Sequence, residues 1–290
     1  MKNMMILDLQ QVMFANVHVH FGMTSEIDEN MLRHLILNQI RSLRKKFKND
    51  YPEFVVAIDS KNNWRKKYFQ YYKANRKKAR DNSEIDFDAI FSAFDKIKTE
   101  LKDHFKYRVV GVDGAEADDV IGVLVKKFGT ESLIKDYSAP NIMIISGDKD
   151  FQQLQRFTNV SQYDPIKKRE IKCSDPVNFL RKHVIKGDSV DGIPNVLSDD
   201  DTFVNDTKRQ PPMTAKRLSR FLSNVDLSEE ERKHFERNEK LIDLTHVPVE
   251  ISTEILRTFD SEENKKTIGS LYSYMIDKKL KQLMGVIDEF

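Results

Sequence analysis

The stretch with the clearest chemical potential is Ser146-Gly-Asp-Lys-Asp150, which directly follows the apolar run Met143–Ile145. An apolar run that stops at a small Ser-Gly step predicts a buried strand and its end. In parallel α/β sheets, ligands bind in the crevice at the carboxyl ends of the strands. Two carboxylates at that place, Asp148 and Asp150, are suited to hold a hard divalent cation.

Other carboxylates occupy comparable positions. Asp8 and Asp59 lie at the ends of two further apolar runs, while Glu116 and Asp118 open a predicted helix that follows a third. Each has an ordinary explanation by itself, because Asp is a common turn residue and acids are favoured at helix N-termini. Parallel strands end at one edge of the sheet, however, so the coincidence of four strand-end positions favours a single shared site.

A second group of acids comes from later in the chain. Asp188 and Asp191 are three residues apart in Gly187-Asp-Ser-Val-Asp-Gly-Ile-Pro194, on one face of a turn. So many carboxylates cannot stay ionised together without cations, because like charges raise each other's pKa. Two Mg²⁺ or Mn²⁺ ions would neutralise them and activate water at a phosphodiester. The spacing of the histidines predicts no histidine-rich metal site, and 199–201 is interpreted as a solvated acidic loop.

The segment 64–80 differs in composition from the rest. It holds eight basic residues, no acid and five aromatic residues, namely Arg65, Lys66, Lys67, Lys73, Arg76, Lys77, Lys78 and Arg80 with Trp64, Tyr68, Phe69, Tyr71 and Tyr72. Cations bind phosphates and rings stack on unpaired bases, so the segment suits a nucleic-acid strand. The alternative is a solvated helix with Phe69 and Tyr72 packed inward. The absence of acids directly after a candidate metal ligand favours the nucleic-acid interpretation.

The elements that must position these residues alternate between strand and helix. Strands are expected at 4–9, 54–58, 107–112 and 141–145, with an edge hairpin of 160–163 and 170–173. The segment 10–19 fits a helix or a strand, and helices are expected at 31–46, 90–101 and 115–128. This alternation predicts an α/β domain, with a mainly parallel central sheet and helices on both faces. After a boundary near Ser174 the chain reads as helical, at 177–185, 215–222, 229–241 and 271–283.

Composition sets the remaining limits. The net charge of +2, from 48 basic and 46 acidic residues, does not by itself indicate nucleic acid. The single cysteine, Cys173, excludes an intrachain disulfide and a cysteine-rich zinc site. The apolar start is too short for a signal peptide, and no stretch is long enough to span a membrane. We therefore expect a soluble, intracellular protein.

Together the motifs resemble those of the 5′-nuclease (flap endonuclease) superfamily, and within it the ribonucleases H of T-even bacteriophages. The resemblance covers essentially the whole chain and rests on Asp8, Asp59, Tyr71-Tyr-Lys-Ala-Asn-Arg76, Glu116-Ala-Asp-Asp119, Ser146–Asp150 and Gly187–Pro194. It implies a PIN-like nuclease domain at 1–174 with a basic arch at 64–88. It also implies a smaller all-α domain at 175–290 that binds duplex DNA and completes the second metal site.

The activity implied is a metal-dependent 5′→3′ nuclease. Such enzymes degrade RNA–DNA hybrid and duplex DNA from the 5′ end, cleave 5′ flaps and remove RNA primers from lagging-strand fragments, leaving 5′-phosphates. The implied cofactor is a pair of Mg²⁺ ions, with Mn²⁺ as an alternative. The first ion would be held by Asp8, Asp59, Asp118 and Asp148 with Glu116 nearby, and the second by Asp150, Asp188 and Asp191.

The resemblance also assigns the basic residues. In the arch, the residues expected to grip the scissile phosphate and the 5′ strand are Tyr72, Lys73, Arg76 and Arg80. DNA-binding residues are expected in the same segment and in the helical domain: Arg65, Lys66, Lys77, Lys208, Arg209, Lys216 and Arg217. After Pro194 the chain runs to Met213 without the Gly-x-Gly turn that the family often has. Whether this loop contacts DNA or binds potassium is left open.

Two other functions are compatible with parts of the sequence. A non-catalytic DNA-junction module is disfavoured by the complete carboxylate set, because buried like charges are costly without a metal. A single-strand ribonuclease of the PIN class would lack the long helical domain. The terminal segment Gln282–Phe290 is either a peptide for a sliding clamp or single-strand DNA-binding protein, or a helix end that packs Phe290. We expect a cytoplasmic monomer, in the cytoplasm of the host cell if the protein is viral.

Overall fold

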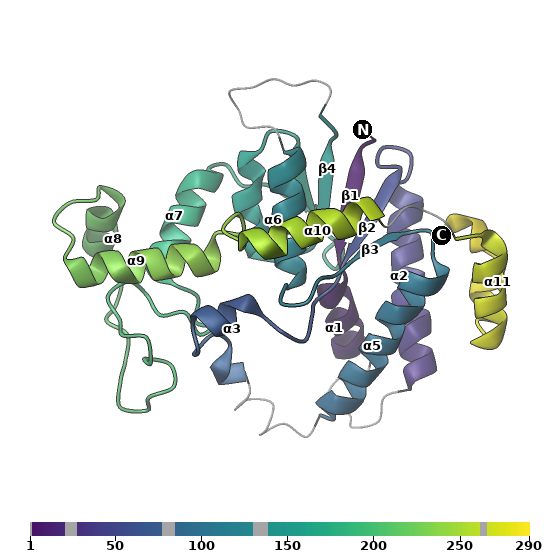
Figure 1. Cartoon of the computed structure of the whole chain (residues 1–290), viewed down its shortest axis with the longest axis horizontal. Helices are drawn as coiled ribbons and strands as arrows, with labels where there is room; N and C mark the ends of the chain where they lie inside the picture. The colour runs from purple at the N-terminus through teal and green to yellow at the C-terminus, as the bar shows by residue number, and fades with distance from the viewer. Residues whose placement is uncertain (1, 21–27, 77–84, 130–138, 262–265) are drawn as a thin grey trace.

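A six-stranded sheet forms the centre of the computed structural model, which describes residues 2–20, 28–76, 85–129, 139–261 and 266–290 (Figure 1). The strand order is β3-β2-β1-β4-β5-β6, and every neighbouring pair is parallel except β5 with β6. The predicted mainly parallel sheet is therefore confirmed, with β5 and β6 as its edge hairpin. The strands are β1 Met4–Asp8, β2 Glu53–Ala57, β3 Arg108–Val110, β4 Ile142–Ile145, β5 Val160–Asp164 and β6 Arg169–Ile171.

Helices cover both faces of this sheet, as the continuous apolar strands predict. Along β1, Met5 and Leu7 face one core, while Met4 and Ile6 face the other. The first core packs against α1 (Leu9–His20), α2 (Glu29–Phe47) and α5 (Phe87–His104). The second packs against α6 (Ala117–Phe128) and the 3₁₀ helix η1 (Lys149–Arg156). The ambiguous segment 10–19 is thus a helix, and it starts directly after Asp8.

Three helices gather at one end of the molecule in Figure 1: α7 (Pro176–Lys186), α8 (Ala215–Leu222) and α9 (Glu229–Ile242). Their starts follow from capping, since Asp175 accepts a hydrogen bond from the Asn178 amide and Ser228 forms a reciprocal capping box with Glu231. These helices match the expected ranges closely. They pack around their own small clusters, one of which includes Leu180, Val184 and Leu241.

The last part of the chain returns to the sheet. Helix α10 (Val249–Ser261), which was not predicted, buries Ile255 and Phe259 in the core beside α6. The single helix expected at 271–283 is two, α11 (Ile268–Asp277) and α12 (Lys281–Met284), because the chain turns at Lys279 with φ +56°. Helices α10 and α11 complete the cores on the two faces of the sheet, although both come after residue 174 in the chain. A domain boundary at residue 174 therefore remains a prediction.

The C-terminal residues form part of the same core. Phe290 packs edge-on against Phe105, with ring centroids 5.5 Å apart. Glu289 pairs with Arg41 and Lys45 of α2. Of the two interpretations of the terminal segment, the structure therefore agrees with the one in which Phe290 packs against the protein. Across the ranges that the structure describes, no helix is both long and apolar enough to cross a membrane.

Candidate metal and nucleic-acid site

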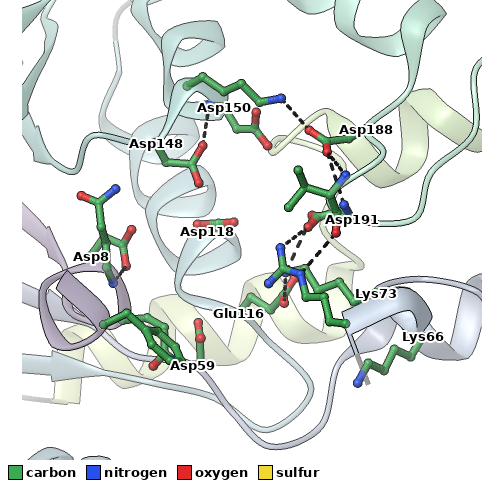
Figure 2. Close-up of a pocket in the computed structure, with 16 residues that line it drawn as sticks. Asp8, Asp59, Lys66, Lys73, Glu116, Asp118, Asp148, Asp150, Asp188 and Asp191 are labelled. Carbon is green, nitrogen blue, oxygen red and sulfur yellow. Dashed lines mark hydrogen bonds and ion pairs between the residues drawn. The ribbon is translucent and has the colours of Figure 1, made fainter. Parts of the chain in front are cut away.

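A cavity of about 400 Å³ opens at the carboxyl edge of the sheet (Figure 2). Four basic side chains contribute to its wall: Lys66, Lys73, Arg76 and Lys149. The structure thus collects into one cavity every carboxylate that the sequence singled out as a metal ligand. These are Asp8, Asp59, Glu116, Asp118, Asp148, Asp150, Asp188 and Asp191.

Short hydrogen bonds fix the carboxylates at the strand ends. Asp8 closes β1, and its two oxygens accept from the Gln11 amide at 3.1 Å and the Ser146 hydroxyl at 3.0 Å. Asp59 follows β2 and accepts from the Ala117 amide at 2.7 Å. The end of β1 is therefore tied to that of β4, and the chain after β2 to the start of α6, which holds the carboxylates at one rim.

The remaining sheet-side acids lie on helix starts. Asp148 caps η1 by accepting from the Asp150 amide at 2.9 Å. Glu116 precedes the first turn of α6, and its own amide donates to Asp119 at 2.9 Å. Asp118 projects from that first turn into the middle of the cavity (Figure 2). Helix N-termini favour negative charge, which explains in part how these acids are tolerated.

Burial makes several of these carboxyls hard to ionise. It raises the pKa of Asp8 to about 7, with repulsion from Asp59 as the next cause. Burial also raises the pKa of Asp59, and it raises that of Asp118 well above its usual range with help from Asp8 and Asp148. In the described ranges Asp8, Asp59 and Asp118 form no ion pair. A positive charge in the cavity would therefore be bound most strongly here.

Glu116, by contrast, is already neutralised. Lys73 Nζ lies 2.6 Å from its carboxylate and Arg65 lies 3.4 Å away, while the Tyr72 hydroxyl donates at 2.8 Å. Burial alone would raise the pKa of Glu116, but Lys73 and Arg65 outweigh it and lower the value to about 2. Burial and the negative charge of Glu116 raise the pKa of Tyr72 well above its usual range, so its hydroxyl stays a donor.

The two acids from the helical part are also paired. Asp191 accepts from Arg76 and from the Tyr72 hydroxyl, the latter at 3.0 Å. Asp188 accepts from Lys149 Nζ at 2.8 Å and lies 3.0 Å from His183 Nε2. Burial opposes the ionisation of Asp188, but these two hydrogen bonds outweigh it and hold its pKa far below the usual range.

The basic segment is anchored on the turn that carries Asp191. The Lys73 amide donates to the Asp191 carbonyl oxygen at 2.7 Å, and the chain at Lys73 adopts φ +56°. Gly192 has φ +71°, and a side chain there would place its Cβ 2.9 Å from the Tyr71 carbonyl oxygen. The turn therefore needs glycine for two independent reasons, its backbone conformation and the close approach of the basic segment.

The burial of Arg65 contradicts its predicted role as a DNA-binding residue. Arg65 is only 2% exposed, pairs with Asp119 at 2.8 Å and donates to the Leu241 carbonyl oxygen at 2.9 Å. Its guanidinium also lies over the Trp64 ring. Arg65 therefore joins α3 (Trp64–Tyr68) to the helical part and cannot reach a DNA backbone from this position.

The aromatic residues of the segment are also mostly inside. Trp64, Phe69 and Tyr72 are buried, the last two against α7 and α9, and Tyr71 is half-buried. Tyr68 is exposed, with Lys240 above its ring. The inward packing weighed for Phe69 and Tyr72 is the arrangement seen, so base stacking across the whole segment is not supported.

The other predicted DNA-binding residues have mixed positions. Lys208 pairs with Asp199 and Asp201 at 2.7 Å, so the loop interpreted as solvated is partly neutralised by it. Lys66 lies on the cavity wall, whereas three further cations are exposed on the helical part: Arg209, Lys216 and Arg217. Lys77 and Arg80 lie outside the described residues.

Sequence reasoning missed several side chains that shape the cavity. Lys149 and His183 both contact Asp188, and Gln11 and Ser146 orient neighbouring groups. Lys149 and Ser146 belong to the Ser146–Asp150 motif itself, so the sequence already places them beside the candidate ligands. His183 gave no such signal, because it is a lone histidine in an amphipathic helix.

Comparison with known proteins places this geometry in a family. The 5′-3′ exonuclease N-terminal resolvase-like domain matches residues 3–183, and the C-terminal domain of T4 RNase H matches residues 174–290. The chain belongs to the 5′-3′ exonuclease family. Within that family, ribonuclease H of Enterobacteria phage T4 is 34% identical over 98% of this chain and 95% of its own length. A 5′-3′ exonuclease of Buchnera aphidicola is 27% identical over 56% of this chain and 53% of its length.

Solved structures of this exonuclease family share the fold. A T5 5′-exonuclease with bound divalent metal ions (zinc) superimposes with a TM-score of 0.63 at 19% identity, covering 90% of this chain and 100% of its own. The T5 D15 flap endonuclease in complex with DNA and metal ions gives a TM-score of 0.59 at 19% identity, with the same coverage. These structures confirm the predicted fold, while the family match and the T4 relative confirm the superfamily and the nuclease class.

Proposed function

We propose that this member of the 5′-3′ exonuclease family hydrolyses RNA–DNA hybrid and duplex DNA from the 5′ end and cleaves 5′ flaps. Removal of RNA primers from lagging-strand fragments during DNA replication is its proposed role. The observation that carries the proposal is the cavity itself, in which eight carboxylates face the side chains of Lys73 and Arg76. Carboxylates suit the metals of phosphodiester hydrolysis, and the cations suit the phosphate.

The residues present fit a pair of divalent ions, which we propose to be Mg²⁺ with Mn²⁺ as an alternative. The sheet-side set is rich in carboxylate oxygens and short of positive charge, which is the chemistry that hard cations prefer. Bound there, the ions would neutralise the acids and supply an activated water at neutral pH. The first set would be Asp8, Asp59, Asp118 and Asp148 beside Glu116, and the second Asp150 with Asp188 and Asp191.

The chain's own cations would position the substrate. Lys73 and Arg76 now rest on Glu116 and Asp191, across the cavity from Asp8. A phosphate entering the cavity would offer them charge-assisted hydrogen bonds of the same kind as those that they make to these carboxylates. Tyr72, held between Glu116 and Asp191, would fix the depth to which the strand enters.

Binding of the duplex is proposed for the exposed cations away from the cavity. Arg209, Lys216 and Arg217 lie on the helical part and would neutralise backbone phosphates, while Lys66 would continue the path at the cavity wall. A single-strand DNA-binding protein and a sliding clamp are proposed partners of a monomer. Neither is assigned to 282–290, because Phe290 is packed. The proposed location is the cytoplasm of a host cell.

Cleavage of two 5′-labelled substrates, a flap and an RNA–DNA hybrid, tests the function. With Mg²⁺ we expect short 5′-phosphate products from both, and none with EDTA. Asp148→Asn should lose most activity while still binding DNA, whereas the exposed control Asp103→Asn should match the wild type. Tight binding of the flap without cleavage in Mg²⁺ or Mn²⁺ would instead identify a non-catalytic junction-binding module.

A further inference from the structure

A buried histidine at the edge of the cavity has a ring nitrogen that no group satisfies. His183 is 8% exposed on α7, and its Nε2 lies 3.0 Å from Asp188 Oδ2. Its other nitrogen, Nδ1, lies 3.5 Å from Asp150 Oδ1. Both Nδ1 and Oδ1 are buried, and neither has a hydrogen-bond partner within the described ranges.

The contacts of Asp188 determine which ring nitrogen of His183 carries the proton. Asp188 Oδ1 accepts from the amides of Val190 and Asp191, and Oδ2 accepts from Lys149 Nζ. A carboxylate so surrounded by donors acts as an acceptor, so Nε2 of a neutral imidazole must carry the hydrogen. The lone pair is then on Nδ1, the ring nitrogen that lies 3.5 Å from Asp150 Oδ1.

Two buried acceptors this close together are costly unless a proton or a metal ion lies between them. Their separation of 3.5 Å suits a shared metal ion. Two ligands that each lie about 2.1 Å from one ion stand roughly 3.0–3.5 Å apart at bond angles between octahedral and tetrahedral. Potential ligand atoms of Asp150, His183 and Asp188 all lie within 4.8 Å of one another.

We propose that His183 Nδ1 and Asp150 Oδ1 bind a divalent first-row transition-metal ion, while Asp188 orients the imidazole. A carboxylate that accepts from the far ring nitrogen is the usual partner of a metal-binding histidine. Imidazole nitrogen favours such ions over Mg²⁺, which prefers oxygen. This end of the cavity would therefore differ in metal preference from the all-oxygen set around Asp8 and Asp118. The inference builds on the proposed metal-dependent function and refines its second site.

Mn²⁺ is the probe for the test, because its electron spin reports nitrogen ligands directly. Pulsed EPR of the full chain with Mn²⁺ alone should show ¹⁴N modulation, which ¹⁵N-histidine labelling should convert to the ¹⁵N pattern. His183→Gln should abolish the modulation and weaken Mn²⁺ binding about tenfold or more, with Mg²⁺ affinity nearly unchanged. His234→Gln is the matched control, since His234 is equally buried but faces the Val196 carbonyl.

Asp188→Asn separates orientation from direct binding. It should weaken Mn²⁺ binding yet keep the ¹⁴N modulation, because the ring nitrogen remains available. Wild-type protein that binds Mn²⁺ without nitrogen modulation would overturn the proposal, and would indicate that His183 is only a cation pairing with two carboxylates. Modulation that survives in folded His183→Gln, checked by circular dichroism, would overturn it as well. Since no substrate is used, either result leaves the flap-cleavage test of the proposed function unaffected.

Discussion

Replacing one buried carboxylate should stabilise the metal-free protein, and Asp8→Asn is the clearest case. Asp8 is 6% exposed, and burial with repulsion from Asp59 raises its pKa to about 7 from an ordinary 3.8. For a group whose pKa is raised on folding, the favourable contribution is complete below the unfolded value and is lost as the pH rises through the folded value. The ionised Asp8 should therefore destabilise the fold progressively between about pH 4 and pH 7.

The expected size follows from the two pKa values. Their difference corresponds to about 4 kcal/mol of unfolding free energy at pH 8, which is a ceiling because neighbouring acids share the repulsion. An amide at this position still accepts from the Gln11 amide and donates to the Ser146 hydroxyl, so little but charge is changed. We expect a gain of about 2–4 kcal/mol at pH 8 and less than about 0.5 kcal/mol at pH 4.

Urea unfolding in EDTA at both pH values measures this difference. Asp103→Asn, which removes an exposed carboxylate from α5, serves as the control and should change stability little at either pH. Adding Mg²⁺ should reverse the order at pH 8, because the wild type gains binding energy that the variant has lost. If Asp8→Asn is no more stable than wild type at pH 8 in EDTA, ionised Asp8 does not destabilise the folded state.

Three further outcomes follow from the cations. Lys73→Ala should lower the cleavage rate about 100-fold with little loss of duplex binding, and equal losses in a turnover and a filter-binding assay would argue against a role at the scissile phosphate. Arg65→Ala should cost about 3–5 kcal/mol in urea unfolding because it strands a buried carboxylate, and a loss below about 1 kcal/mol would contradict the buried pairing. Lys216→Ala with Arg217→Ala should reduce the slope of log affinity against log salt by about 2, whereas Lys208→Ala, which removes a paired cation, should change it less.

The fold was largely predictable because its signals are local. Apolar runs of strand length predicted β1 to β4, and the capping residues Asp28 and Asp175 stand directly before α2 and α7. Helix α10 was missed although Ile251, Ile255 and Phe259 recur at helical spacing. The break between α11 and α12 could not be predicted, because a lysine with positive φ leaves no pattern in the sequence.

The residue pattern alone predicted the carboxylates of the candidate site, and the family resemblance added Lys73 and Arg76, which line the cavity. Strand ends of a parallel sheet meet at one edge, so Asp8, Asp59 and Asp148 could be placed without knowing any distance. Partners were a different matter, since they depend on how distant segments dock. The same basic run contains Arg65, which is sealed against Asp119, and Lys73, which reaches the cavity. Composition cannot separate these two cations, because only tertiary packing decides which side each one faces.

The docking of that segment also explains how so many acids fold together. On the side of the cavity near the basic segment, Glu116 and Asp191 are neutralised by Lys73 and Arg76 (Figure 2). On the sheet side, Asp8 has its pKa raised instead, and there the protein contributes hydroxyl and amide donors but no ion pair among the described residues. A cation is therefore favoured most at the sheet side, and under the proposed function the substrate phosphate would lie at the other. The division of charge within one cavity would thus assign separate places to the two kinds of ligand before either of them binds.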